Sequence, residues 1–322
     1  MGKKFLKSII IAAFTLASVF VPNSNVYAED KPAIWLQVSP VANRITLNPG
    51  DELTYTMQVD NIGSEKFSFK VYATPYTVAN EEYEINFSTE TNRTQISRWI
   101  TFNQNANAQK DSEKDWKNEV KFDLEPDQHQ VVEYKITVPD DIPAGGQYAT
   151  IFAESIPEGG TTSTGVHTIS RVGLILYGTT NGETVSKAVI SDFSLKPFIT
   201  SGKITANANL SNEGNTDFTS IMKMKIEKLF GGTVTELEGS YTIIPDAPAR
   251  HATLEWNDTP AFGIFRVKTT INALDESFED SRIVIILPIF IIVIMVMLLT
   301  IIIVWLIMLI RKRRAQKSRL IV

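Results

Sequence analysis

Apolar and polar residues alternate with a period of two along most of the chain. Leu53, Tyr55, Met57 and Val59 alternate with polar residues. The same period recurs in the segments 67–71, 132–138, 204–210 and 222–226. Such a period places successive side chains on opposite faces of an extended strand, so each segment predicts a strand with one buried face. Short strands separated by Asn-Gly, Pro-Gly and Pro-Asp turns favour an all-β fold made of sandwiches.

Three short patterns occur twice, in the same order. The pairs are 61–63 and 212–214 (Asn-x-Gly, with Phe67 or Phe218 four residues after the glycine), 124–127 and 244–246 (apolar, Pro, Asp), and 143–148 and 260–265 (Pro-Ala leading through Gly into an apolar strand). Ordered repetition of this kind predicts two related modules. We therefore expect two tandem Ig-like β-sandwich domains, at 33–179 and 183–274.

A polar insertion, 80–119, interrupts the first predicted domain. It is rich in Asn, Gln and Thr, and it carries the aromatic residues Tyr83, Phe87, Trp99, Phe102 and Trp116. Long loops on rigid sandwiches often carry function, so these five residues are candidates for binding a sugar or a peptide. The alternative is that Trp99 and Trp116 pack the loop onto the sandwich. A second loop, 158–165, contains almost only Gly, Thr and Ser and is predicted to be flexible.

Both ends of the chain carry targeting signals. Three lysines, an apolar stretch and Val26-Tyr27-Ala28 predict a signal peptide over 1–28. The apolar run 283–310 is long enough to span a bilayer, and an acidic stalk, 275–282, is expected to precede it. Four basic residues follow the run: Arg311, Lys312, Arg313 and Arg314. Because Lys and Arg stay cytoplasmic, we expect a single-pass type I membrane protein with extracellular N-terminal domains and a cytoplasmic tail, 311–322.

Charge and cysteine content narrow the class of protein. The chain carries −5 overall, and the leader and tail contribute nine positive charges, so the exterior carries about −14. This negative net charge argues against nucleic acid or anionic lipid as the ligand of the exterior domains. It suits a cationic partner or a cell wall, or solubility alone. With no cysteine, the exported domains must be held by their hydrophobic cores, which suits a bacterial exterior.

We expect no enzyme, no metal and no cofactor. Thiol catalysis is impossible without cysteine, and His129, His167 and His251 lie in separate strands without ligand spacing. The acidic pairs 81–82 and 140–141 lack the spacing of a calcium loop and are interpreted as solvated surface.

The motifs at 38–40, 45–50, 59–63, 124–126, 136–139 and 145–148 resemble the WxL-interacting protein family. The resemblance implies a signal peptide, two Ig-like modules, one C-terminal span and a basic tail. It also implies that the first module binds peptidoglycan, that the second binds a host ligand, and that surface proteins with WxL domains are partners. The insertion is unusually polar and the second module matches only loosely, so no binding residue is carried over. The opening segment is also similar to pilus chaperones, which lack a membrane span.

We expect a membrane-anchored bacterial cell-surface protein that binds cell-wall peptidoglycan or a partner surface protein through loops and sheet edges. Two alternatives stay open. One is an assembly factor that lends a sheet edge to partner subunits by strand addition, which requires an exposed, unpaired edge strand. The other is an accessory subunit of a membrane complex, contacting its partner through the span.

Overall fold

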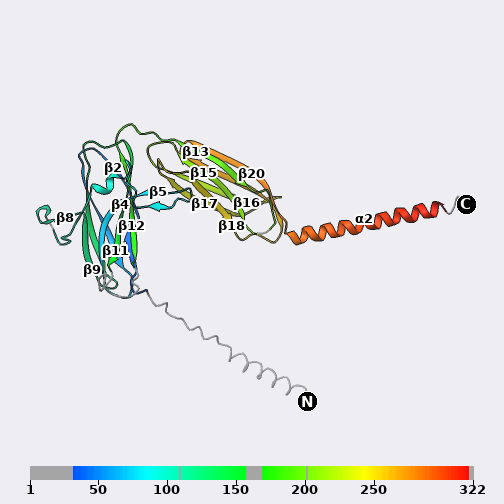
Figure 1. The fold of residues 1–322 in the computed structure, drawn as a ribbon, viewed down its shortest axis with the longest axis horizontal. Coiled ribbons are helices and arrows are strands. Elements are labelled where there is room, and N and C mark those ends of the chain that lie inside the picture. Colours follow the sequence, from blue (N-terminus) through cyan, green and yellow to red (C-terminus); the bar gives the residue numbers. More distant parts are fainter. Residues whose placement is uncertain (1–31, 109, 157–168, 201, 319–322) are drawn as a thin grey trace, which may run out of the picture.

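The computed structural model describes residues 32–108, 110–156, 169–200 and 202–318. The predicted signal peptide and the predicted flexible loop 158–165 lie outside these residues. Two β-sandwiches follow one another and a single long helix extends from the second (Figure 1). The predicted all-β fold, with one C-terminal apolar helix, is therefore confirmed.

The first domain packs two five-stranded sheets face to face. One sheet has the order β1 (Leu36–Ser39), β3 (Glu52–Asn61), β10 (His129–Thr137), β7 (Ile100–Asn103) and β8 (Trp116–Lys117). The other has the order β2 (Ala42–Leu47), β12 (Arg171–Thr180), β11 (Gly145–Ile156), β4 (Phe67–Pro75) and β9 (Glu119–Leu124). The alternating apolar residues of both sheets meet in one core, in which Met57, Phe69 and Tyr134 are buried.

The second domain contains a three-stranded and a five-stranded sheet. The smaller has the order β13 (Ala188–Leu195), β15 (Ile204–Asn212) and β18 (Arg250–Trp256). The larger has the order β14 (Phe198–Ile199), β20 (Glu276–Ile286), β19 (Gly263–Ala273), β16 (Phe218–Lys228) and β17 (Thr233–Ile243). Its core buries Ala206, Ala208, Met222 and Met224, which occupy alternate positions of β15 and β16, as the sequence pattern predicts.

The two domains share one strand order, as the repeated patterns predict. β14-β20-β19-β16-β17 repeats β2-β12-β11-β4-β9, and β13-β15-β18 repeats β1-β3-β10. In each domain one pair is parallel, β2 with β12 and β14 with β20. The third repeated pattern has a steric basis, because a Cβ on Gly146 or Gly263 would collide with the aromatic ring two residues later, on Tyr148 or Phe265. Glycine at these strand starts lets the ring fold back over the backbone.

Apart from β5, the insertion accounts for the elements of the first domain that have no counterpart in the second. It begins after the strand β5 (Thr77–Val78) and contains β6 (Ile85–Asn86), the 3-10 helices η1 (Gln95–Arg98) and η2 (Asp111–Glu113), and the strands β7 and β8. The expectation of a single long loop is therefore wrong for its middle part. Ile96, Ile100 and Phe102 are buried in the core, and β7 pairs with β10.

The membrane-proximal segment also differs from the prediction. Residues 275–282 do not form an acidic stalk: Glu276–Ile286 is β20, which pairs with β19 along its whole length. Buried and exposed residues alternate at its apolar end, where Val284 and Ile286 are buried and Ile283 and Ile285 are exposed. The helix α2 (Ile289–Ser318) therefore begins later than the predicted span 283–310. Residues Ile289–Arg311 are long and apolar enough to cross a membrane.

Candidate functional site

The start of the insertion, residues 80–93, joins the two domains. The β5–β6 hairpin reaches from the first domain toward the second (Figure 1). At its tip, the Tyr83 hydroxyl accepts a hydrogen bond from the Ile244 amide at 2.8 Å. The Glu81 carbonyl accepts one from the His251 amide at 2.9 Å. The Arg250 guanidinium lies 4.4 Å from the centre of the Tyr83 ring, within cation–π range.

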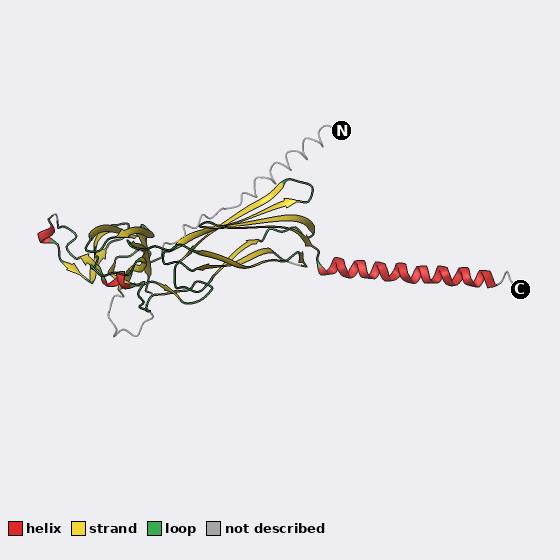
Figure 2. Ribbon diagram, turned by 90° about the horizontal axis from the view of Figure 1, so that it is seen from above, coloured by secondary structure: helices red, strands yellow, loops and turns green. Residues whose placement is uncertain are grey.

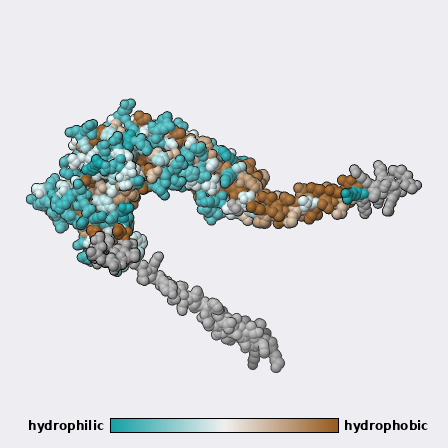
Figure 3. All heavy atoms as spheres, in the orientation of Figure 1, coloured by the Kyte–Doolittle hydropathy of each residue, from teal (hydrophilic) through white to brown (hydrophobic). Residues whose placement is uncertain are grey.

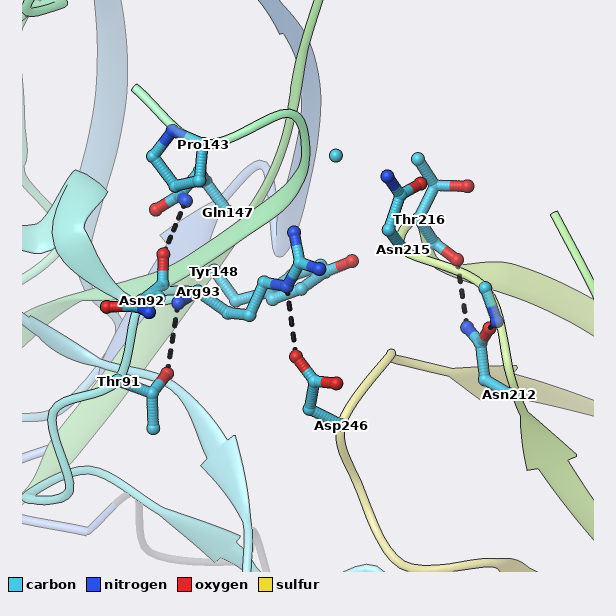
Figure 4. A network of polar contacts seen from close by, with 12 residues as sticks. Thr91, Asn92, Arg93, Pro143, Gln147, Tyr148, Asn212, Asn215, Thr216 and Asp246 are labelled. Carbon is cyan, nitrogen blue, oxygen red and sulfur yellow. Dashed lines mark hydrogen bonds and ion pairs between the residues drawn. The ribbon is translucent and has the colours of Figure 1, made fainter. Parts of the chain in front are cut away.

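Arg93 forms a second bridge across the junction (Figure 4). Its Nε donates to the Asp246 carboxylate at 3.0 Å, and its Nη1 donates to the Ala144 carbonyl at 2.8 Å. Gln147 Nε2 donates to the Asn92 carbonyl at 2.7 Å, which ties the same segment to β11. One arginine thus connects the insertion, the first sandwich and the second.

A third bridge involves the carboxylate of Asp217 in the second domain. The Tyr148 hydroxyl donates to Asp217 Oδ1 at 3.3 Å, and Arg44 forms an ion pair with the same carboxylate. Close by, the Asn215 carbonyl accepts from the Gly146 amide at 2.7 Å. Gly145 has a φ of +106°, and a Cβ there would collide with that carbonyl, so only glycine permits this approach of the two domains.

The junction contains neutral tyrosines and paired charges. Tyr76, Tyr148 and Ile244 form a small buried cluster between the domains. Burial raises the pKa of Tyr83 to about 12, against the opposing effects of the Ile244 amide and of Arg250. Burial likewise raises the pKa of Tyr76 and of Tyr148. These hydroxyls therefore stay neutral at physiological pH and act as fixed hydrogen-bonding groups.

A cavity of about 250 Å³ lies beside these bridges, lined in part by Thr77, Asn86, Thr91, Arg93 and Asp246. Its arginine and carboxylate neutralise each other across the 3.0 Å contact. The cavity can hold a small polar group. Its polar side chains nevertheless already serve the junction, so we assign it a structural role.

The later part of the insertion, which contains η2 and β8, forms the end of the molecule farthest from α2 (Figure 2). There the half-buried Trp116 lies on β8, the edge strand of its sheet. Lys114 Nζ and Lys135 Nζ lie 5.7 and 5.0 Å from its ring centre. We call Trp116 with these two lysines the distal rim. Lys114 also contacts Glu133 at 2.7 Å and Asp111 at 3.0 Å, and these hydrogen bonds raise its pKa.

The polar composition of the insertion has a structural explanation. Asn103 is buried, and its amide makes four hydrogen bonds of 3.0–3.1 Å, to Asn105, Asp115 and Glu133. Gln104 donates to the Lys121 carbonyl at 2.8 Å and accepts from its amide at 3.1 Å, which covers the open edge of β9. These side chains therefore take the place of backbone partners around the distal rim.

The structure divides the five predicted binding aromatics among three places. Phe102 lies in the core, and Trp99 packs against it. Tyr83 and Phe87 pack into the junction cluster. Only Trp116 remains at an open edge, so the five do not form one platform. Of the two tryptophans that the alternative interpretation packs onto the sandwich, Trp99 packs against the first core, whereas Trp116 is half-buried on the edge strand β8.

Sequence reasoning missed the junction residues Arg44, Arg93, Tyr148 and Asp217. One sequence signal for the junction was available. Asp246 belongs to the repeated pattern at 244–246, and that turn contacts the first domain. The described residues contain no group of three His, Asp or Glu side chains that could hold a metal ion.

No protein-family model matches the chain, and no curated protein sequence matches it. Among solved structures, the class 5 fimbriae chaperone CfaA is 13% identical over 79% of this chain and 100% of its own, with a TM-score of 0.36. The Escherichia coli chaperone DraB is 13% identical over 77% and 98%, with a TM-score of 0.34. The Pseudomonas aeruginosa chaperone CupB2 is 10% identical over 76% and 99%, with a TM-score of 0.33. These likenesses are too weak to support any conclusion about function.

Proposed function

We propose that this protein is a membrane-anchored surface protein that binds cell-wall glycan through the distal rim of its first domain, with a partner surface protein as the alternative ligand. α2 would span the membrane, with its basic C-terminal end in the cytoplasm. The orientation rests on the positive-inside rule applied to Arg311, Lys312, Arg313 and Arg314.

The observation that carries the proposal is the position of Trp116. Of the five candidate aromatics, it alone lies on an open sheet edge, and its strand β8 lies at the end of the molecule opposite α2 (Figure 1). Tryptophan offers a large, rigid apolar face and is enriched where proteins bind ligands. The junction supports this role, because three bridges between the domains hold the rim away from the membrane.

The charges around Trp116 favour a ligand that is recognised by shape and stacking. Lys114 is paired with Glu133 and Asp111, and Lys135 is paired with Glu52 at 3.5 Å. Their positive charge is therefore largely neutralised locally. Binding that depends on the indole face should resist salt, whereas binding through exposed charges would be screened.

Co-sedimentation of the full chain, in detergent, with insoluble peptidoglycan tests the proposal. Trp116→Ala removes the indole, and Trp35→Ala is the matched control, since Trp35 is an exposed tryptophan just before β1 at the opposite edge of the same sheet. We expect salt-resistant sedimentation that Trp116→Ala reduces at least tenfold and Trp35→Ala leaves unchanged. Equal binding by both variants would move the site away from the distal rim. No sedimentation at any salt would remove wall binding and leave the protein partner.

A second candidate, strand addition, is favoured by one edge of the second domain. β17 has eleven residues and pairs only with β16, so among the described residues its outer edge has no partner strand. The edge of β18 is different: the Tyr241 hydroxyl donates to the Thr253 carbonyl at 2.7 Å and accepts from its amide at 3.1 Å. Strand addition would therefore use β17 and not β18.

Proline substitutions separate this candidate from wall binding. Of Glu236→Pro and Leu237→Pro, one removes an amide that faces β16 and the other removes an amide that faces the free edge. The variant that keeps its fold would block addition of a strand while leaving peptidoglycan sedimentation unchanged. If that variant still retains every surface protein that purifies with the unsubstituted chain, β17 is not the binding edge.

A further inference from the structure

The second domain is joined to the helix with almost no linker. Only Leu287 and Pro288 separate β20 from α2. The Leu287 amide donates to the Ile199 carbonyl at 2.8 Å, and the Ile285 amide donates to the Pro197 carbonyl at 2.9 Å. The chain is thus hydrogen-bonded to the domain up to two residues before the helix. If α2 spans a bilayer, this end of the domain must lie at the membrane surface.

Strand register brings three phenylalanines to this end. Gly263 pairs with Ile286, so Phe262, one residue earlier, lies level with the start of the linker. Phe198 pairs with Ile285. Lys228 pairs with Phe265, and Phe230 forms part of the hairpin tip just beyond it. Three separate segments of the domain therefore lie at the end from which α2 extends.

These three side chains are unusually exposed for phenylalanine. Phe230 is 98% exposed, Phe262 68% and Phe198 46%. The neighbouring strands add the exposed cross-strand pair Ile264 and Ile285. The hydropathy surface shows apolar residues at this end of the domain merging with those of α2 (Figure 3). Contiguous exposed apolar surface of this kind marks a protein or membrane contact.

The charges at this end of the domain favour contact with an anionic membrane surface, although the exterior as a whole has a negative net charge. Lys196 and Lys228 are exposed and form no ion pair among the described residues. Most nearby carboxylates are already engaged: Glu255 pairs with Lys203, and Glu227 pairs with Lys268. In the loop that carries Phe262, the acidic residue is the exposed Asp258.

We propose that Phe198, Phe230 and Phe262 insert into the headgroup layer of the bilayer that α2 spans, with Lys196 and Lys228 contacting anionic phospholipid headgroups. This inference rests on the membrane anchoring proposed above. Apolar side chains such as Phe gain from burial at the boundary between headgroups and acyl chains, and basic side chains near it gain from anionic lipid. The bilayer is the natural occupant because the apolar surface is continuous with the helix. The second domain would then stand on the membrane in a fixed orientation.

The absence of cysteine permits single-site fluorescent labelling of the full chain. An environment-sensitive probe is placed at Asp258→Cys, beside the proposed contact, in vesicles of phosphatidylcholine and phosphatidylglycerol. Spin-labelled lipid quenches a probe that lies at the same depth. We expect shallow quenching at residue 258 that falls at least twofold when Phe198, Phe230 and Phe262 are all changed to Ser. Unchanged quenching in the triple variant would overturn the insertion.

Two further probe sites separate this proposal from membrane anchoring. Thr300→Cys reports the middle of α2, and Leu274→Cys reports an exposed turn at the opposite end of the second domain. We expect deep quenching at residue 300 and none at residue 274. Quenching at residue 300 without any at residue 258 overturns the docking alone. No quenching at residue 300 overturns the anchoring, and the docking with it. In vesicles of phosphatidylcholine alone, unchanged quenching at residue 258 would remove the role of the two lysines.

Discussion

Asn61 and Asn212 make the same three hydrogen bonds in the two domains. The Asn61 amide nitrogen donates to the carbonyls of Glu65 and Leu124 at 2.9 and 3.2 Å, and its oxygen accepts from the Gly63 amide at 3.0 Å. Asn212 donates to the carbonyls of Thr216 and Ile243 at 2.8 and 3.0 Å and accepts from the Gly214 amide at 2.9 Å. Each asparagine closes one turn and ties it to the end of a neighbouring strand.

Replacing either asparagine with alanine should destabilise its own domain. Asn61 is fully buried and Asn212 is partly exposed, so Asn61→Ala should cost more, about 2–3 kcal/mol against about 1–2 kcal/mol. Chemical unfolding of the full chain in detergent, followed by tryptophan fluorescence, measures both. Equal and negligible costs would show that water replaces these hydrogen bonds.

Phe102 should be essential for folding although it lies in the polar insertion. Its side chain is 0% exposed in the first core. Phe102→Ala should therefore lower the free energy of unfolding by about 3–5 kcal/mol, because it leaves a cavity. Phe230→Ala is the control, since Phe230 is almost fully exposed and its loss should leave the stability unchanged. Deletion of the whole insertion, 80–119, should abolish cooperative unfolding of the first domain, because it also removes Ile96 and Ile100.

Tyr83→Phe should loosen the junction without unfolding either domain. The change leaves the ring under Arg250 but removes the hydroxyl that accepts from the Ile244 amide, a loss of about 1–3 kcal/mol. Spin labels at Thr54→Cys and Asp258→Cys, one in each domain, should report a broader distance distribution. Tyr55→Phe, a change within the first core, should leave the distribution as narrow as in the unsubstituted chain.

Glu154 should make part of the stability depend on pH. Burial by itself raises its pKa, but the hydrogen bonds from Tyr72 and Lys70, together with the charges of Lys70 and Arg171, outweigh that effect and lower it below 4.5. A carboxyl whose folded pKa is lowered stabilises the protein above the unfolded pKa, and this contribution is lost as the pH falls through the folded value.

Glu154→Gln should therefore cost up to about 1 kcal/mol at neutral pH, and the difference from the unsubstituted chain should shrink below about pH 4.5. Denaturant unfolding at a series of pH values measures it. Asp258→Asn, at an exposed loop position, is the control and should have little effect at any pH. A difference that stays constant as the pH falls would mean that the charge of Glu154 contributes nothing.

The sequence predicts the strands well because alternation is a local property. Met57 and Val59, or Ala206 and Ala208, occupy positions of period two, and any buried sheet face would require that pattern. The similarity of the two domains can also be predicted from the sequence, because the Asn-x-Gly turns and the Gly-x-aromatic strand starts depend on contacts within a few residues. The aromatic residues of the insertion are harder to interpret, because the sequence does not show whether each of them packs against the sandwich or stays open to a ligand.

The sequence by itself determined the class of fold, the repeated modules and the apolar helix, because periodicity, turn residues and hydropathy act over short distances. Only the tertiary structure decided that Phe102 belongs to the core, that Tyr83 and Arg93 bridge the domains, and that Trp116 is left at the rim. It also decided that residues 276–286 form a strand. Each of these outcomes depends on which distant segment lies opposite a residue, and that is set by the packing of the whole chain.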